Sequence, residues 1–179
     1  KEAVDASLDH LRPWMPWAAN EPTELQAKID WLRACRGKFD QDIDYVYGIF
    51  DRAEERVLGG TGLHTRLGPG ALEVGYWIRA DAINQGLATE ASLALTQVAF
   101  VLHRVNRVEI HCDPANARSA AIPRKLGFTQ EAILRQRLYL EDGDWRDVMI
   151  WTLLAQDYAS TPSAKFSIEA LDAIGRQIL

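Results

Sequence analysis

The stretch IRADAINQGLATEA (residues 78–91) decides the fold, because the spacing of apolar residues changes within it. A strand ends at Arg79 and a helix begins near Gly86. Backbone N–H groups at a helix start have no partner inside the helix, and the helix dipole adds about half a positive charge there. The junction therefore predicts a site for an anion such as a phosphate, which Gly86 lets approach closely. It contains neither a Walker A lysine loop nor the GxGxxG dinucleotide fingerprint.

The segments on both sides of this junction predict one mixed sheet. β-branched and aromatic runs or strict alternation indicate strands, and helical spacing of apolar residues indicates helices. Helices are expected over 5–12, 24–37, 86–103 and 117–126, and strands over 42–50, 57–65, 72–79, 107–112, 130–140 and 146–154. This order predicts an α/β (α+β) fold with a sheet that is antiparallel at first and has a βαβ crossover in its middle. The last two strands flank the turn Asp142-Gly143-Asp144.

The last residues of the chain look separate from the rest. Thr161 and Pro162 interrupt the preceding pattern, which divides the sequence into a domain of residues 1–160 and a C-terminal segment of residues 161–179. Ser167 is a plausible N-cap for an amphipathic helix whose apolar stripe is Ile168, Leu171, Ile174 and Ile178. The helix would either pack on its own domain or form a dimer contact, so both a monomer and a homodimer stay open.

Composition excludes several classes of protein. The chain has 179 residues, of which 47% are hydrophobic and 25% charged, as in an ordinary globular domain. Its net charge of −5 does not favour a nucleic-acid-binding face, and no apolar run is long enough for a membrane helix. Cys35 and Cys112 are not in a metal-type spacing, so no metal is expected. With no export signal in the sequence, we expect a cytoplasmic protein.

A second segment, DPANARSAAIPRKLGF (113–128), places Asn116 and Ser119 at a helix start and Gly127-Phe128 at its exit. With LRPWMPW, LEVGYWI, NQGLATEA and the DGDWRD hairpin, it resembles the GNAT N-acetyltransferase superfamily, and most closely its ribosomal-protein-alanine (RimJ/RimL-like) branch. The resemblance covers nearly all of residues 5–157. It implies a mostly antiparallel, twisted sheet with flanking helices, whose usual first strand would precede residue 1.

The resemblance also implies a ligand and its place. Acetyl-CoA, as cosubstrate and without a metal, would lie in a splay between strands 72–79 and 107–112. Its pantetheine arm would bond to the backbone of Trp77, Ile78 and Arg79, and contact Asn116. Its pyrophosphate would lie on the amides of Asn84, Gln85, Gly86, Leu87, Ala88 and Thr89. Three positions depart from the family pattern: Ile83 and Asn84 in the phosphate loop, and Pro123 where many members have a tyrosine.

Several side chains are candidates for catalysis. Glu73 shares a strand face with Trp77 and is the preferred base for deprotonating an amine, with His111 on the neighbouring strand second. Ser119 would lie near the sulfur and stabilise the departing thiolate, and Tyr139 is an alternative hydroxyl. The substrate-wall candidates are Trp14, Trp17 and Tyr139. Cys112 is interpreted as a small buried hydrophobe.

We therefore expect an acyltransferase that moves the acetyl group of acetyl-CoA directly to a primary amine. The favoured acceptor is a protein or peptide N-terminal α-amine, including that of a ribosomal protein. A small-molecule amine, such as an antibiotic, a polyamine or an amino acid, is the alternative. A member that binds acyl-CoA as a sensor without turnover also stays open, because of Ile83 and Pro123.

Overall fold

A six-stranded sheet organises the chain, with its strands in the order β1-β2-β3-β4-β6-β5. The structure is a computed structural model that describes residues 1–140 and 143–179. The strands are β1 (Tyr45–Phe50), β2 (Val57–His64), β3 (Ala71–Ile78), β4 (Arg107–Cys112), β5 (Thr129–Tyr139) and β6 (Trp145–Leu154). The helices are α1 (Glu2–Asp5), α2 (Leu8–Leu11), α3 (Leu25–Asp40), α4 (Leu87–Val101), α5 (Ala117–Leu126), α6 (Ala155–Tyr158) and α7 (Pro162–Lys165), with 3-10 helices η1 (Pro16–Asn20) and η2 (Ala80–Ala82).

The sheet topology confirms the predicted fold class. Strands β1, β2 and β3 form an antiparallel meander, and α4 then crosses over to β4, which runs parallel to β3. The final hairpin places β6 between β4 and β5, both antiparallel to it. Within the described part of the chain, β3 and β4 are thus the parallel pair of an otherwise antiparallel sheet. The expected turn residue Asp142 lies outside the described residues.

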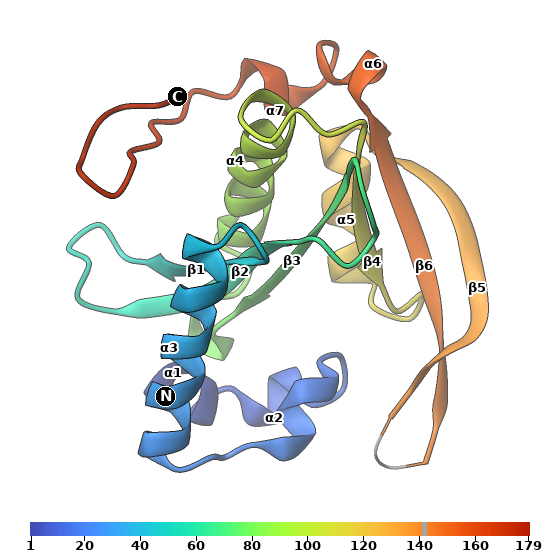
Figure 1. The fold of residues 1–179 in the computed structure, drawn as a ribbon. Coiled ribbons are helices and arrows are strands. Elements are labelled where there is room, and N and C mark those ends of the chain that lie inside the picture. The colour runs from blue at the N-terminus through green and yellow to red at the C-terminus, as the bar shows by residue number, and fades with distance from the viewer. Residues whose placement is uncertain (141–142) are drawn as a thin grey trace.

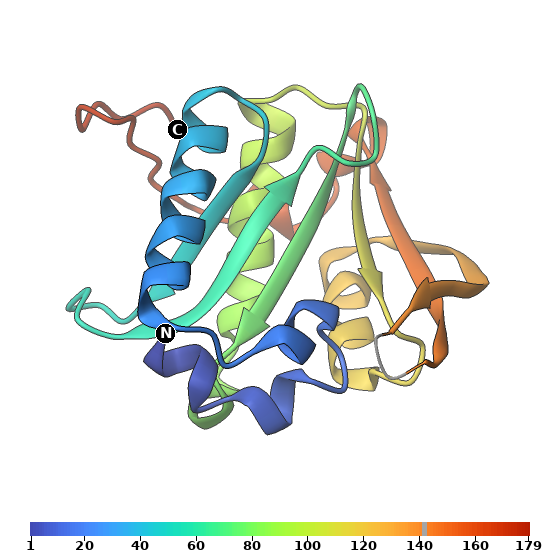
Figure 2. The same ribbon diagram turned by 60° about the horizontal axis from the view of Figure 1, so that its bottom comes forward.

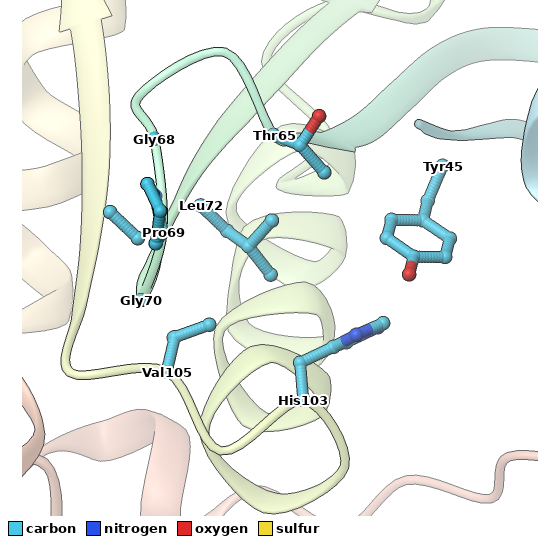
Figure 3. A pocket seen from close by; sticks show the side chains of 9 residues that line it. Tyr45, Thr65, Gly68, Pro69, Gly70, Leu72, His103 and Val105 are labelled. Carbon is cyan, nitrogen blue, oxygen red and sulfur yellow. The ribbon is translucent and has the colours of Figure 1, made fainter. Parts of the chain in front are cut away.

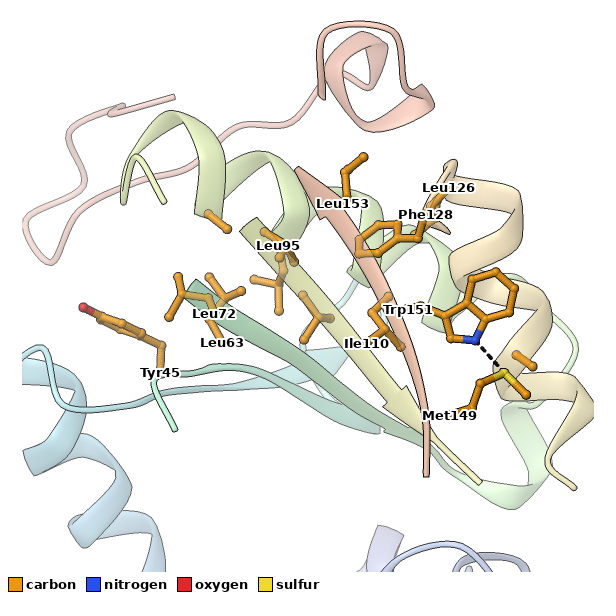
Figure 4. Packing of buried hydrophobic residues seen from close by; sticks show 14 residues of the cluster. Tyr45, Leu63, Leu72, Leu95, Ile110, Leu126, Phe128, Met149, Trp151 and Leu153 are labelled. Carbon is orange, nitrogen blue, oxygen red and sulfur yellow. Dashed lines mark hydrogen bonds between the residues drawn. The ribbon is translucent and has the colours of Figure 1, made fainter. Parts of the chain in front are cut away.

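Helices cover both faces of the sheet. Figures 1 and 2 show α4 and α5 on one face, and α3 with the N-terminal segment on the other. The first of these faces carries the core, which includes Leu72 and Val74 of β3, Val108 and Ile110 of β4 and Leu95 of α4 (Figure 4). Alternation then turns Glu73, Gly75 and Trp77 toward the other face. No helix in residues 1–140 or 143–179 is long and apolar enough to cross a bilayer.

Strands β3 and β4 pair only at their beginnings and then separate. Their register runs from Ala71 opposite Arg107 to Glu73 opposite Glu109 and stops there. Beyond this point β4 continues to pair with β6 along its whole length, while β3 continues to pair with β2. The facing edges of β3 and β4 are therefore left without each other's hydrogen bonds, and the sheet opens there into a splay.

Helix α5 begins and ends where the sequence predicts, because both of its ends are capped. The Asn116 side chain accepts a hydrogen bond from the Ser119 N–H at 3.1 Å. At the other end Gly127 adopts φ +85°, and the Phe128 N–H donates to the Pro123 carbonyl at 3.0 Å. Local chemistry alone fixes this helix, and with it the position of Ser119 on its first turn.

The N-terminal segment differs from the expected single helix over residues 5–12. Two short helices, α1 and α2, are separated at Ser7, which is buried. The Ser7 hydroxyl donates to the Ala3 carbonyl at 2.7 Å and accepts from the Ala80 N–H at 3.0 Å. The break thus attaches this segment to the end of β3, a tertiary contact that helical periodicity does not show.

The predicted C-terminal amphipathic helix is wrong. After α7 the chain forms a small hairpin, with a bridge between Leu171 and Gln177 and a tight turn at Gly175, where φ is +79°. The Asp172 carboxylate accepts from the backbone N–H groups of Ile174 and Arg176, which competes with helical hydrogen bonding. Glycine and aspartate at these positions favour a turn over the apolar stripe that suggested a helix.

Candidate functional site

A cleft of about 1430 Å³ opens on the sheet face opposite the core, at the splay. Its floor is formed by β2 and β3, one wall by α3, and the other wall by the N-terminal segment and the β5–β6 hairpin. The cleft brings together seven of the residues that the sequence marks as candidates: Trp14, Trp17, Glu73, Trp77, His111, Asn116 and Ser119.

The part of the cleft around Trp77 is lined by aromatic side chains. The Trp77 indole lies across Gly60 of β2, so closely that a Cβ atom at Gly60 would be 2.5 Å from the indole Nε1. Trp17 meets Trp77 edge-to-face, with ring centroids 6.0 Å apart. Trp14 also lines the cleft, so the WMPW segment forms part of its wall.

Glu73 is the centre of a buried network of charges at the foot of the splay. Arg66 donates to both of its oxygens, at 2.7 Å to Oε2 and 2.5 Å to Oε1. His111 lies between two carboxylates, with Nδ1 3.7 Å from Glu73 Oε2 and Nε2 2.6 Å from Glu109 Oε2. Burial acts to raise the pKa of Glu109, but hydrogen bonds with Arg107 and His111 outweigh it and hold that pKa below its usual value.

Ser119 faces the splay from the first turn of α5. Its Oγ lies 2.9 Å from the hydroxyl of Tyr76, which reaches it from β3. Burial raises the pKa of the Cys112 thiol at the end of β4, although a hydrogen bond with Ser119 acts in the opposite direction. Cys112 is therefore a protonated, weakly nucleophilic thiol at neutral pH. Position 123, where the family resemblance leads one to expect a tyrosine, is a proline buried inside α5, and a proline has no hydroxyl to donate.

The loop before α4 presents unpaired backbone donors. Asn84 and Gly86 both have left-handed backbones, with φ of +61° and +85°. Asparagine tolerates this conformation better than most non-glycine residues, which explains how a side chain is accommodated at position 84. A Cβ atom at Gly86 would meet no protein atom within 4 Å. Within residues 1–140 and 143–179, no protein acceptor takes the N–H groups of Asn84 to Thr89.

Only part of the expected pantetheine edge has free backbone groups. The Arg79 N–H donates to the Leu58 carbonyl at 2.8 Å, and by alternation the backbone of Trp77 also faces β2. Ile78 and Tyr76 direct their backbone groups toward β4 instead. The Arg79 side chain donates to Glu2 at 3.0 Å, so it holds the N-terminal segment in place.

Tyr139 lies outside the cleft lining, as do the backbone candidates Ile78, Arg79 and residues 84–89, and the structure adds one residue that sequence reasoning missed. The Tyr139 ring packs on Trp145 of the same hairpin, with centroids 5.0 Å apart. His64 does line the cleft, directly across from Glu73, and its Nδ1 lies 2.9 Å from Asp44 Oδ1. The alternation of β2 could have placed His64 on the cleft face, but the Asp44 contact depends on tertiary structure.

A smaller hollow of about 400 Å³ lies at the opposite end of β3 (Figure 3). Tyr45 and His103 meet across it, with ring centroids 4.5 Å apart. Burial lowers the pKa of His103 and raises that of Tyr45 to about 12, so neither ring is charged at neutral pH. The hollow therefore has fewer groups suited to catalysis than the cleft at the splay.

Comparison with known proteins agrees with this geometry. The family described as "Acetyltransferase (GNAT) domain" matches residues 3–129. YdaF of Bacillus subtilis (strain 168), provisionally named a ribosomal N-acetyltransferase, is 34% identical over 86 residues, which are 48% of this chain. That match spans only 46% of YdaF, a little under half of its length. The ribosomal protein uS5-alanine N-acetyltransferase of Escherichia coli (strain K12) is 26% identical over 153 residues, 83% of this chain and 77% of that protein.

Solved structures show the same fold. RimL, a ribosomal protein acetyltransferase crystallised with coenzyme A, superposes with a TM-score of 0.76 at 21% identity, over 86% of this chain and 85% of that one. The family match, the βαβ crossover and the unpaired donors before α4 all agree. This chain belongs to the GNAT acetyltransferase family.

Proposed function

We propose that this enzyme transfers the acetyl group of acetyl-CoA to the α-amine of a protein or peptide N-terminus. The observation that carries the proposal is the splay between β3 and β4, which pair only as far as Glu73 and Glu109 and then open into the cleft. A strand-like ligand can add there to the free edge of β3. Ser119 on one side and Glu73 on the other then face the same space.

The residues around the splay fit coenzyme A. The unpaired N–H groups of Asn84–Thr89, at the positive end of α4, suit a pyrophosphate. The open space at Gly86 lets it approach the backbone. Ile78 and Tyr76 offer backbone groups to the amides of the pantetheine arm, while Trp77 and Asn116 line its path.

The reaction is direct aminolysis of a thioester. The neutral amine nitrogen attacks the carbonyl carbon, the C–S bond breaks, and the thiol of coenzyme A and an N-acetyl amide are the products. At pH 7 deprotonation costs about 1.4 kcal/mol for an α-amine and about 4.6 kcal/mol for a lysine. We assign the amine proton to Glu73, directly or through water, with His111 beside it. Ser119 donates a hydrogen bond to the departing thiolate.

The shape of the cleft supports a peptide as acceptor. It continues from the splay along α3, where Trp31 and Phe39 line it, so an extended chain can lie there. The name of the Escherichia coli relative, an alanine N-acetyltransferase of a ribosomal protein, agrees with this acceptor class. A small-molecule amine is the second candidate, because the aromatic wall of Trp17 and Trp77 would also bind a compact apolar acceptor.

A thiol-release assay tests the proposal. The enzyme is incubated with acetyl-CoA and, separately, with peptides bearing a free α-amine, with polyamines and with single amino acids. We expect acceptor-dependent release of coenzyme A that is fastest with peptides. Faster release with a small amine would favour the second candidate. Tight binding of acetyl-CoA without release for any acceptor would instead indicate a sensor.

A further inference from the structure

The hydroxyl of Tyr76 occupies a position that sequence alternation did not suggest. Alternation places Tyr76 on the core side of β3, where a tyrosine ring serves packing. In the structure its hydroxyl instead reaches Ser119 on α5, 2.9 Å from the serine Oγ and 3.3 Å from the serine carbonyl oxygen. Both residues line the cleft. The two hydroxyls thus form a pair at the place where β3 and β4 have separated.

Besides Tyr76, Ser119 contacts Asn116 through its backbone N–H and the Cys112 thiol through its side chain. Its N–H donates to the Asn116 side chain at 3.1 Å, which anchors the first turn of α5. Burial raises the pKa of Tyr76 well above its ordinary value, so the phenol keeps its hydrogen at neutral pH and can donate it. Ser119 Oγ is the nearer of its two acceptors. When Oγ accepts from Tyr76 and from the protonated Cys112 thiol, its own hydrogen is directed elsewhere, and the cleft is the open side.

We propose that Tyr76 is a positioning residue that orients the Ser119 hydroxyl toward the thioester sulfur. This inference rests on the acetyl transfer proposed above. As the C–S bond breaks, the electron pair of that bond passes to sulfur, and Ser119 O–H donates a hydrogen bond to the developing thiolate. Tyr76 donates to Ser119 Oγ throughout and loses no proton. Without Tyr76, Ser119 can rotate among its rotamers and donates to sulfur only part of the time.

A double-mutant cycle tests this role. The acetylation rates of Tyr76→Phe, Ser119→Ala and the double variant are compared with those of the unaltered enzyme at saturating acceptor. Phenylalanine keeps the ring and removes only the hydroxyl. We expect Tyr76→Phe to lower kcat about 5-fold to 10-fold, as for loss of one hydrogen bond, with KM for acetyl-CoA nearly unchanged. In the Ser119→Ala background the same change should have no further effect on kcat.

The matched control is Tyr158→Phe, which removes a hydroxyl from a ring packed against the core outside the cleft and should leave kcat unchanged. Thermal unfolding verifies that each variant is folded. If Tyr76→Phe does not fold, 3-fluorotyrosine at position 76 keeps the ring and its hydroxyl but makes the hydroxyl a stronger donor. It should raise kcat only while Ser119 is present.

Two kinds of result overturn the inference. A normal kcat for Tyr76→Phe in an active enzyme refutes the positioning role of Tyr76 and leaves the proposed acetyl transfer standing. An unchanged kcat for the fluorinated enzyme does the same. Losses that multiply in the double variant show that Tyr76 acts independently of Ser119. If the unaltered enzyme itself transfers no acetyl group to any acceptor, the proposed function fails, and this inference fails with it.

Discussion

At the scale of a single residue, the chemistry of Glu73 depends on its deep burial and on its two neighbours, Arg66 and His111. Glu73 is 5% exposed, and Arg66 holds both of its oxygens. Arg66 itself is largely exposed, so this ion pair is buried on the Glu73 side and open to solvent on the other. Alternation along β3 predicted that Glu73 faces the cleft. Arg66 comes from the β2–β3 turn, and no local pattern places its guanidinium there.

Glu73→Gln should lower kcat by about 10²-fold to 10⁴-fold near neutral pH, because it removes the group that takes the amine proton. The deficit should shrink as the pH rises, since more of the acceptor is then already neutral. Affinity for CoA should not change. Glu131→Gln on exposed β5 is the matched control. Steady-state rates against pH measure the effect, and an unaltered rate near neutral pH would make Glu73 structural.

Ser119→Ala should lower the rate without abolishing it, because a thiolate is already a fair leaving group. Loss of one transition-state donor costs about 2.7–4 kcal/mol in oxyanion sites, and we expect the low end or less. Ser160→Ala, on the surface after α6, is the control. Kinetics at saturating acetyl-CoA measure the effect. Complete loss of activity in the folded variant would contradict a supporting role.

The raised pKa of Cys112 also bears on the order of events. A thiol that stays protonated does not attack a thioester, so we expect no acetyl-enzyme. The test is the intact mass of the enzyme after incubation with acetyl-CoA in the absence of acceptor. A stoichiometric acetyl adduct on Cys112 or Ser119 that disappears when amine is added would replace direct transfer with a covalent route.

At the scale of elements, the β3–α4 junction and α5 were predictable from sequence because local chemistry fixes them. The change in apolar spacing located the start of α4. Asn116 and Gly127 mark the two ends of α5. The C-terminal hairpin was not predictable from the apolar stripe, which suggested a helix instead. Asp172 and Gly175 determine the conformation there, and the periodicity argument gave the stripe more weight than the turn residues.

Gly86→Glu should abolish CoA binding, because it places bulk and negative charge among the unpaired donors before α4. Gly68→Glu is the matched control: Gly68 has φ +88° and open space around it, and it lines the hollow with His103 beyond the other end of α4, so a similar backbone strain arises away from the start of that helix. Titration calorimetry measures both affinities. Equal affinity in the two folded variants would remove the phosphate site from this loop.

The charge network at the foot of the splay predicts a pH dependence of stability. Because the folded pKa of Glu109 is lowered, its charged form stabilises the fold above the unfolded pKa of about 4.3, and this contribution is lost as pH falls through the folded pKa. Glu109→Gln should therefore lower Tm clearly near pH 7 and much less near about pH 3. Thermal unfolding at both values measures this. An equal loss of Tm near pH 7 and near about pH 3 would contradict this stabilising role of the charged Glu109.

At the scale of the whole molecule, sequence alone predicted the order of the six strands and of α3, α4 and α5, the crossover and the family. The family resemblance implied a splay between β3 and β4, but the sequence did not show how far these strands stay paired or how α3 and the N-terminal segment cover the opposite face (Figure 2). Contacts that join distant segments, such as Tyr76 with Ser119 and His64 with Asp44, also appear only in the folded chain.

The most direct test of the proposed function is the position of the acetyl group on a peptide acceptor. A peptide with a free α-amine and one internal lysine is incubated with enzyme and acetyl-CoA beside the same peptide with a formylated N-terminus, and fragment masses locate the modification. The proposed function predicts one acetyl group on the α-amine of the free peptide and none on the blocked one. Acetylation of the lysine in both peptides, or of neither peptide while a small amine is acetylated, would contradict the proposed function.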